Sequence, residues 1–269
     1  MKSDFGDVFS SAKSYESYVG RWSRLVGHQF IAWLDVVPGY VWLDVGAGTG
    51  ILTQVILRDA SPAKVVGVDL SKEYIEFARQ QIRDDRVEFR VGDAADIIFE
   101  SPQFDVSVAG LVLNFLPDPE HAVKSMVQAV RSGGVVAAYV WDYGGQMEMM
   151  RHFWDAAIKV DPSAEEADAG QRFTICRPDN LRSLFQSVDL REIDVIPIDI
   201  QTPFQDFDDY WLPFLGAQGS VSKYLRSIND ETRTALRNQL QSQLLTTPDG
   251  AIRLMARAWA VKGKKDSAG

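Results

Sequence analysis

Residues 41–52 read Val-Trp-Leu-Asp-Val-Gly-Ala-Gly-Thr-Gly-Ile-Leu, and this stretch decides how the chain is expected to fold. An apolar run over 41–45 is broken only by Asp44, which is typical of a buried strand. Three alternating glycines follow it: Gly46, Gly48 and Gly50. Apolar residues then recur at helical spacing over 51–56. The stretch predicts a strand, a tight turn and a helix, with a turn that lets a ligand approach the backbone near the positive end of the helix.

The glycine spacing separates two kinds of ligand. The dinucleotide fingerprint G-x-G-x-x-G needs its third glycine at position 51, where this chain has Ile51. Asp44 lies two residues before the first glycine, where a carboxylate repels a pyrophosphate and attracts an ammonium group. The turn therefore favours a nucleoside with a cationic amino-acid tail over a dinucleotide. A purely structural βα turn is the other interpretation.

A second apolar run, over 65–70, predicts the next strand and ends in an acid. Asp69 lies 23 positions after Gly46. In doubly wound folds an acid about 20 residues beyond the glycines accepts hydrogen bonds from ribose hydroxyls. Asp69 would otherwise cap the next helix, but Ser71 already suits that task. We therefore predict that Asp69 binds a ribose and that Leu70 packs against the adenosine.

Composition and charge limit the class of protein. The 269 residues carry a net charge of −9, so no excess of Lys and Arg supplies the counterion release that favours nucleic-acid binding. The single cysteine, Cys176, cannot form an intrachain disulfide, and no metal-ligand spacing stands out. No apolar stretch approaches about 20 residues, and no signal peptide is visible. We expect a cytoplasmic protein without nucleic acid, metal or membrane span, and its oligomeric state stays open.

Leu43-Asp44-Val45-Gly46-Ala47-Gly48-Thr49-Gly50 resembles the first motif of the class I S-adenosylmethionine-dependent methyltransferases. The later landmarks are similar in order to the small-molecule branch of that family, which includes the quinone-biosynthesis C-methyltransferases. The resemblance implies an α/β fold with a doubly wound, mostly parallel seven-stranded sheet of the Rossmann-like methyltransferase type. It implies a last strand that is antiparallel and inserted between strands five and six. It also implies S-adenosylmethionine as the cofactor.

The same resemblance implies how the cofactor is held. Ala47 and Thr49 would join the three glycines around it. Asp93 would accept from the adenine amino group while the Ala94 amide donates to a ring nitrogen, since an adenine edge offers both a donor and an acceptor. The alternative for Asp93 is a turn residue that bonds its own backbone.

Two further segments are expected beside the cofactor. Ala109, Gly110 and Leu111 end the strand at the switch point of the sheet, where such folds bind ligands, and Gly110 would permit close approach. Arg21 resembles a residue of the segment that covers the cofactor, and its guanidinium would meet the cofactor carboxylate. A surface arginine beside a helix-packing Trp22 is the alternative.

The rest of the chain predicts three regions. Residues 1–40 form an N-terminal helical cover segment, residues 41–200 and 251–263 form the Rossmann-like core, and residues 201–250 form an inserted helical cap over a substrate pocket. Further strands are expected at 87–91, from 104, and at 135–141, 191–200 and 253–262. Glycines 133 and 134 should end a helix, Pro197 indicates an edge strand, and the acidic segment 161–170 should be a loop.

The chemistry of methyl transfer asks little of the protein beyond alignment and the exclusion of water. A general base is needed only for a poorly nucleophilic acceptor, and the candidates are His121 and Tyr18. We expect transfer to a small, partly apolar acceptor, whose identity and reacting atom stay open. A non-catalytic S-adenosylmethionine-binding or regulatory module is one alternative. An NAD-dependent oxidoreductase is another, which Gly50 and Ile51 disfavour.

Overall fold

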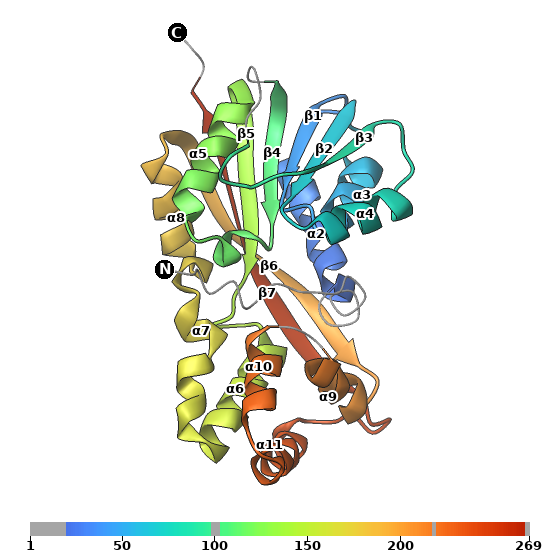
Figure 1. Cartoon of the computed structure of the whole chain (residues 1–269), viewed down its shortest axis with the longest axis vertical. Helices are drawn as coiled ribbons and strands as arrows, with labels where there is room; N and C mark the ends of the chain where they lie inside the picture. The colour runs from blue at the N-terminus through green and yellow to red at the C-terminus, as the bar shows by residue number, and fades with distance from the viewer. Residues whose placement is uncertain (1–19, 98–102, 217–218, 267–269) are drawn as a thin grey trace. The chain divides into compact units, whose positions relative to one another are not determined.

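The computed structural model describes residues 20–97, 103–216 and 219–266. These residues form a 7-stranded sheet in the order β3-β2-β1-β4-β5-β7-β6 (Figure 1). The strands are β1 (Val41–Val45), β2 (Lys64–Asp69), β3 (Val87–Val91), β4 (Phe104–Gly110), β5 (Val130–Trp141), β6 (Leu190–Phe204) and β7 (Ile252–Lys265).

Helices follow β1, β2, β4 and β5, as expected for an α/β fold. The α-helices are α2 (Arg21–Leu34), α3 (Ile51–Asp59), α4 (Lys72–Gln81), α5 (Pro119–Ala129), α6 (Glu148–Val160), α7 (Ala169–Arg172), α8 (Pro178–Ser187), α9 (Phe207–Gly216), α10 (Ser220–Ser227) and α11 (Asp230–Gln243). Short 3-10 helices lie at η2 (Leu113–Phe115), η3 (Pro162–Ala167) and η4 (Thr174–Cys176). In the described part of the chain, every helix is too short or too polar to cross a membrane.

The strand pairing confirms the predicted sheet. β1 pairs in parallel with β2 and with β4, and the pairs β2–β3 and β4–β5 are parallel as well. β7 lies between β5 and β6, and its arrow in Figure 1 points opposite to that of β6. The strand order reverses between β1 and β4, so these two strands flank the switch point at which open α/β sheets bind ligands.

The central strands are buried, which explains their apolar sequences. Every residue of β1 after Val41 is buried, as are the first six residues of β4. Parallel strands covered by helices on both faces read as continuous apolar runs. A cluster around Phe89 packs α4 against the sheet and the glycine turn: Ala47, Ile75, Ala78, Phe89, Ile82 and Val87.

The fifth strand begins earlier than predicted. Phe104 pairs with Val130, but two residues later Val106 pairs with Val135, so residues 131–134 form a bulge in β5. The prediction that the glycine pair at 133–134 ends the helix is wrong, because α5 already ends at Ala129. A Cβ at position 134 would lie 2.8 Å from the Arg131 carbonyl oxygen, so the bulge requires glycine there.

The sixth strand forms an edge of the sheet, as Pro197 predicts. Buried and exposed residues alternate from Ile198 to Phe204. The strand therefore continues beyond the predicted end at residue 200, and it includes the buried Thr202 and Phe204.

The chain divides into two compact units. Among the described residues, the sheet unit comprises 23–97, 103–140, 177–198 and 259–266, and the helical unit comprises 20–22, 141–176, 199–216 and 219–258. Most of the predicted cap, residues 201–250, folds as α9, α10 and α11 within the helical unit. That these helices cover a substrate pocket stays a prediction.

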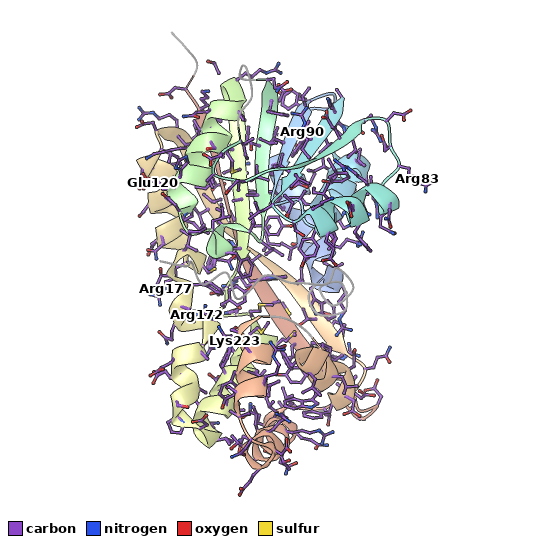
Figure 2. The ribbon with its side chains drawn as sticks, viewed as in Figure 1. Arg83, Arg90, Glu120, Arg172, Arg177 and Lys223 are labelled. Carbon is purple, nitrogen blue, oxygen red and sulfur yellow. The ribbon has the colours of Figure 1, made fainter. Side chains whose placement is uncertain are left out.

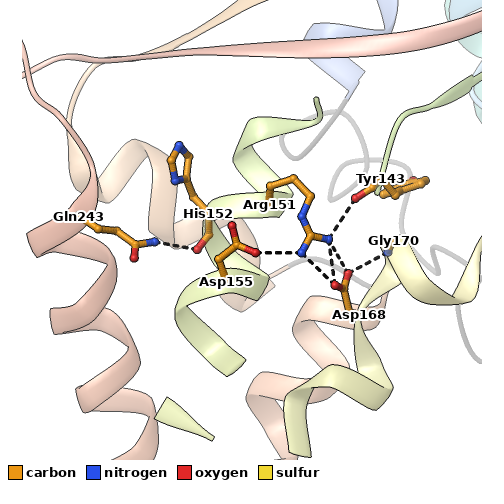
Figure 3. A network of polar contacts seen from close by, with 7 residues as sticks. All are labelled: Tyr143, Arg151, His152, Asp155, Asp168, Gly170 and Gln243. Carbon is orange, nitrogen blue, oxygen red and sulfur yellow. Dashed lines mark hydrogen bonds and ion pairs between the residues drawn. The ribbon is translucent and has the colours of Figure 1, made fainter. Parts of the chain in front are cut away.

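An ion-pair network stabilises the helical unit (Figure 3). Arg151 on α6 donates to both carboxylate oxygens of Asp168 at 2.8–2.9 Å and to Asp155 at 3.0 Å. The Asp168 side chain is only 2% exposed, and it also accepts from the N–H of Gly170 at 2.8 Å. The network thus ties α6 to the start of α7.

The acidic segment 161–170 is not the predicted loop, because η3 and α7 form there. Asp161 caps η3 by accepting from the N–H of Ser163, and Pro162 occupies its first turn. Asp168 caps α7 in the same way. Asp161 and Asp168, which led to the prediction of a loop, are helix caps. The Asp-Pro pair at 161–162 is typical of a helix start.

Candidate functional site

The carboxyl ends of the parallel strands bring the predicted acids to one edge of the sheet. Asp44 of β1 is level with Gly67 of β2, and Asp69 is level with Val91 of β3. Asp93 follows two residues after that strand end. The register therefore places the three predicted acids at the same edge, next to the turn that follows β1.

The three glycines of that turn have different roles. All have positive φ, at +69° for Gly46, +55° for Gly48 and +86° for Gly50. A Cβ at Gly46 would lie 2.5 Å from Val112, and one at Gly50 would lie 2.5 Å from Ile82. A Cβ at Gly48 would meet no atom of the described residues closer than 3.9 Å. Internal packing therefore requires the first and third glycines, whereas the second leaves the surface of the loop open.

Asp69 links this open part of the loop to the end of β2. Its Oδ2 accepts from the N–H of Gly48 at 2.9 Å, and its Oδ1 accepts from the N–H of Ser71 at 2.8 Å. Burial raises the pKa of the Asp69 carboxyl, and the two backbone hydrogen bonds oppose that rise. Ser71 caps α4 by accepting from Tyr74, as predicted, so the helix does not need Asp69. Carboxylate oxygens accept more than one hydrogen bond, which leaves acceptor capacity for a ligand hydroxyl.

Asp44 is a buried carboxyl group with one satisfied oxygen. The side chain is 1% exposed, and its Oδ2 accepts from Oγ1 of Thr53 on α3 at 2.6 Å. Its Oδ1 is buried and has no partner among the described residues. Burial raises the pKa of Asp44 to about 7, the Thr53 hydrogen bond lowers it, and the charge of Asp69 raises it further. An uncompensated acceptor of this kind suits a positively charged ligand group.

The residues expected near adenine lie at the ends of β2 and β3. Leu70 is 62% exposed, so it offers an apolar surface beside Asp69. Asp93 is exposed and accepts from the N–H of Ala95 at 2.9 Å, which is the turn bond considered as its alternative role. Ala94 between them is buried. This hydrogen bond uses only Oδ1 of Asp93. Recognition of adenine by Asp93 therefore stays a prediction.

The end of β4 forms a tight, strained turn. Leu111 is 8% exposed and has a φ of +59°, which is rare for a residue with a side chain. Its N–H donates to the Tyr139 carbonyl at 2.8 Å. A Cβ at Gly110 would lie 2.8 Å from the Tyr139 hydroxyl and 3.0 Å from Leu52. Packing against Tyr139 and Leu52 is therefore sufficient to explain the glycine at 110, for which we predicted close approach of a ligand. Ala109, the preceding residue, is fully buried.

Arg21 belongs to the helical unit, whereas Asp44, Asp69 and Asp93 belong to the sheet unit. Its Nη1 donates to Asp209 at 3.0 Å, and its guanidinium lies 4.4 Å from the Trp22 ring and 4.9 Å from the Phe204 ring. Nε and Nη2 of Arg21 are buried without a partner among the described residues. Arg21 is therefore not a plain surface residue, because its guanidinium pairs with Asp209 and contacts two aromatic rings.

Of the two candidate bases, only His121 lies among the described residues. His121 is exposed in the first turn of α5, where its N–H donates to the capping Asp118. Its neighbour Glu120, labelled in Figure 2, forms an ion pair with Lys124. Tyr18 lies outside the described residues.

Two residues that support the site were not predicted from the sequence. Thr53 bonds the Asp44 carboxylate, and Val112 fills the space that requires glycine at position 46. A threonine on the otherwise apolar face of 51–56 was an available signal for Thr53. No local pattern indicates Val112, because its contact joins the ends of β1 and β4.

Comparison with known proteins relates the chain to methyltransferases. Residues 43–138 match the family described as "Methyltransferase domain". The chain is 24% identical over 212 residues to the arsenite methyltransferase of Halobacterium salinarum, covering 77% of this chain and 50% of that protein. It is 27% identical over 110 residues to the demethylmenaquinone methyltransferase of Desulfitobacterium hafniense, covering 39% and 44% respectively. The predicted resemblance to small-molecule methyltransferases is confirmed.

A solved structure shows the same fold. Phosphoethanolamine N-methyltransferase 2 of Haemonchus contortus, in complex with S-adenosyl-L-methionine, gives a TM-score of 0.58 at 16% identity. The match covers 95% of this chain and 56% of that one. The chain spans about half the length of the curated relatives it matches, 50% and 57% for two of them.

Proposed function

We propose that this chain, whose residues 43–138 match a methyltransferase-domain family, transfers a methyl group from S-adenosylmethionine to a small, partly apolar acceptor. The observation that carries the proposal is the contact between Gly48 and Asp69. Of the three loop glycines, Gly48 has open space before it, and its N–H is bonded to the acid at the end of β2. A ligand beside Gly48 would contact backbone without a side chain and the Asp69 carboxylate together, and a nucleoside with ribose hydroxyls fits such a site.

The other residues of the edge support an adenosyl ligand with a cationic tail. The exposed side chain of Leu70 offers an apolar face beside the proposed ribose acceptor, and Asp93 follows at the next strand end. Oδ1 of Asp44 has no hydrogen-bond donor among the described residues. We assign the adenosine to Asp69, Leu70, Asp93 and Ala94, and the amino-acid tail to the glycine turn and Asp44. The two Arg21 nitrogens that have no partner among the described residues support its proposed contact with a carboxylate.

The protein's contribution to the reaction is then mainly positional. Bound S-adenosylmethionine would supply an activated methyl group, because its sulfur loses a positive charge on transfer. Holding two reactants in line contributes about 7–11 kcal/mol to lowering a bimolecular barrier. The residues around the glycine turn would hold the donor, and the chain would exclude water from it. His121 and Tyr18 remain proposals for a general base.

The proposal has two rivals of different class. An NAD-dependent oxidoreductase would need a loop that accepts a pyrophosphate, but Asp44 places a carboxyl group behind that loop and Ile51 replaces the third fingerprint glycine. A regulatory module would bind S-adenosylmethionine without turning it over. The names of the relatives, which include methyltransferases for arsenite and demethylmenaquinone, favour an enzyme with a small acceptor.

Calorimetry on the purified chain tests the binding step. We expect saturable binding of S-adenosylmethionine and of S-adenosylhomocysteine, and none of NADH. Tight NADH binding without affinity for the two sulfur compounds would overturn the proposal. Turnover on a panel of phenols, quinol precursors and amines tests the enzymatic step, and cofactor binding without turnover on any of them would favour the regulatory module.

A further inference from the structure

A buried hydrogen bond lies directly behind the glycine turn. Thr53, in the first turn of α3, is fully buried, and its hydroxyl donates to Oδ2 of Asp44 at 2.6 Å. Its neighbours on the same helix are buried and apolar: Ile51, Leu52, Val55 and Ile56. A hydroxyl in such surroundings needs a partner, and a carboxylate is the strongest acceptor it can have.

The bond makes the two oxygens of Asp44 unequal. Oδ2 is held by Thr53, whereas Oδ1 is buried and has no donor among the described residues. The bond restricts rotation of the carboxylate, so α3 limits the directions in which Oδ1 can point. The glycine turn separates the two residues in sequence, so the hydrogen bond also closes the strand–turn–helix unit from behind.

We propose that Thr53 is a positioning residue for cofactor binding: its hydroxyl holds one oxygen of Asp44 so that the other stays directed at the cationic end of the ligand. This inference rests on the proposed function, because it assumes that the ligand of the glycine turn carries an ammonium group. Thr53 itself does not touch the ligand. Its role would be exerted through the orientation and the charge of Asp44.

The charge of Asp44 gives the proposal a second readout. Among the described residues, the groups that act on Asp44 are Asp69, whose charge raises its pKa, and Thr53, whose side-chain and backbone hydrogen bonds both lower it. Burial is the largest influence and brings the pKa of Asp44 to about 7. An ammonium ligand binds better to the ionised carboxylate, so affinity should increase as the pH rises through this range. Loss of the Thr53 donor should move that increase to higher pH.

The test compares three threonine variants by calorimetry with S-adenosylhomocysteine between pH 6 and pH 8.5. Thr53→Val removes the hydroxyl and keeps the shape, whereas Thr53→Ser keeps the hydroxyl. The matched control is Thr202→Val, because Thr202 is equally buried at 1% exposure but its hydroxyl has no partner among the described residues. If Thr53→Val does not fold, Thr53→Cys takes its place, since a thiol is a weaker donor of similar size.

We expect Thr53→Val to weaken binding at pH 7 at least fivefold and to shift the pH dependence upward, with an intermediate loss for Thr53→Cys. Thr53→Ser should restore most of the affinity and the original pH dependence, and Thr202→Val should bind like the parent protein. Equal affinity of parent and Thr53→Val across the pH range would overturn the positioning role alone. Loss of affinity without a change in pH profile would also overturn it, because a merely structural effect predicts that result. Absence of binding by the parent protein would overturn the proposed function together with this role.

Discussion

The backbone N–H of Gly48 donates a 2.9 Å hydrogen bond to Oδ2 of Asp69, although 21 residues separate them. The bond joins the turn after β1 to the end of β2. A residue with φ of +55° and open space at its Cβ thus directs its N–H at the acid that is expected to bind the ribose. The same carboxylate therefore fixes the turn and is available to the ligand.

Substitution of Asp69 should reduce cofactor affinity. Asp69→Ala removes both the ribose acceptor and the bond to Gly48, so we expect at least a tenfold loss of S-adenosylmethionine binding by calorimetry. Asp84→Asn is a suitable control, because Asp84 also accepts from a backbone N–H two residues on but belongs to an exposed turn. Unchanged binding by Asp69→Ala would refute the ribose role.

Alanine substitutions at the glycines should separate folding from binding. A Cβ at Gly46 or Gly50 would lie 2.5 Å from a neighbouring side chain, so both variants should lower the urea midpoint strongly. Gly48→Ala meets no clash and should cost about 1 kcal/mol of stability for its left-handed backbone. It should nevertheless lose at least tenfold in cofactor affinity, because the methyl group projects into the open space. If the loss of cofactor affinity were proportional to the loss of stability in all three variants, this separation of folding from binding would be wrong.

The buried Asp44 should make stability depend on pH. Its folded pKa of about 7 lies above the ordinary value of 3.8, so the folded state binds the extra proton and is destabilised as the pH rises toward 7. Asp44→Asn removes this dependence. We expect the stability of Asp44→Asn relative to the parent to increase by about 3 kcal/mol between pH 5 and pH 8, measured by urea unfolding. A difference that stays constant with pH would show that Asp44 ionises normally.

The network of Figure 3 should be important for the stability of the helical unit. Asp168 is 2% exposed and Arg151 is 18% exposed, so removal of one partner leaves the other charge buried. Asp168→Asn should cost about 3–5 kcal/mol of unfolding free energy. Asp155→Asn, which removes an exposed partner of the same arginine, should cost less than about 1 kcal/mol. Similar losses for the two variants would mean that burial does not control the strength of these pairs.

The local part of the site could be predicted from the sequence. The strand, turn and helix over 41–59 follow from an apolar run, glycine spacing and helical periodicity, and the structure has these elements. The capping role of Ser71 and the edge position of Pro197 are also local properties. Such features depend on neighbouring residues, so pattern and propensity are sufficient to find them.

Features that depend on packing could not be predicted. The glycine pattern does not tell which glycine faces open space, because that depends on Val112 and Ile82. The contact between Arg21 and Asp209 joins residues 188 positions apart, and nothing local to either residue indicates it. The bulge at 131–134 results from pairing with β4, which the local sequence does not indicate. The glycine pair there was therefore predicted to end a helix.

Cys176 is the one thiol in the sequence, and it lies in η4 at 2% exposure. Burial raises its pKa, with a smaller contribution from Asp142, so it is neither ionised nor accessible at neutral pH. The native protein should therefore react little with maleimides. A cysteine introduced at an exposed position such as Arg83, labelled in Figure 2, would accept a fluorophore at one known place without removal of any natural residue.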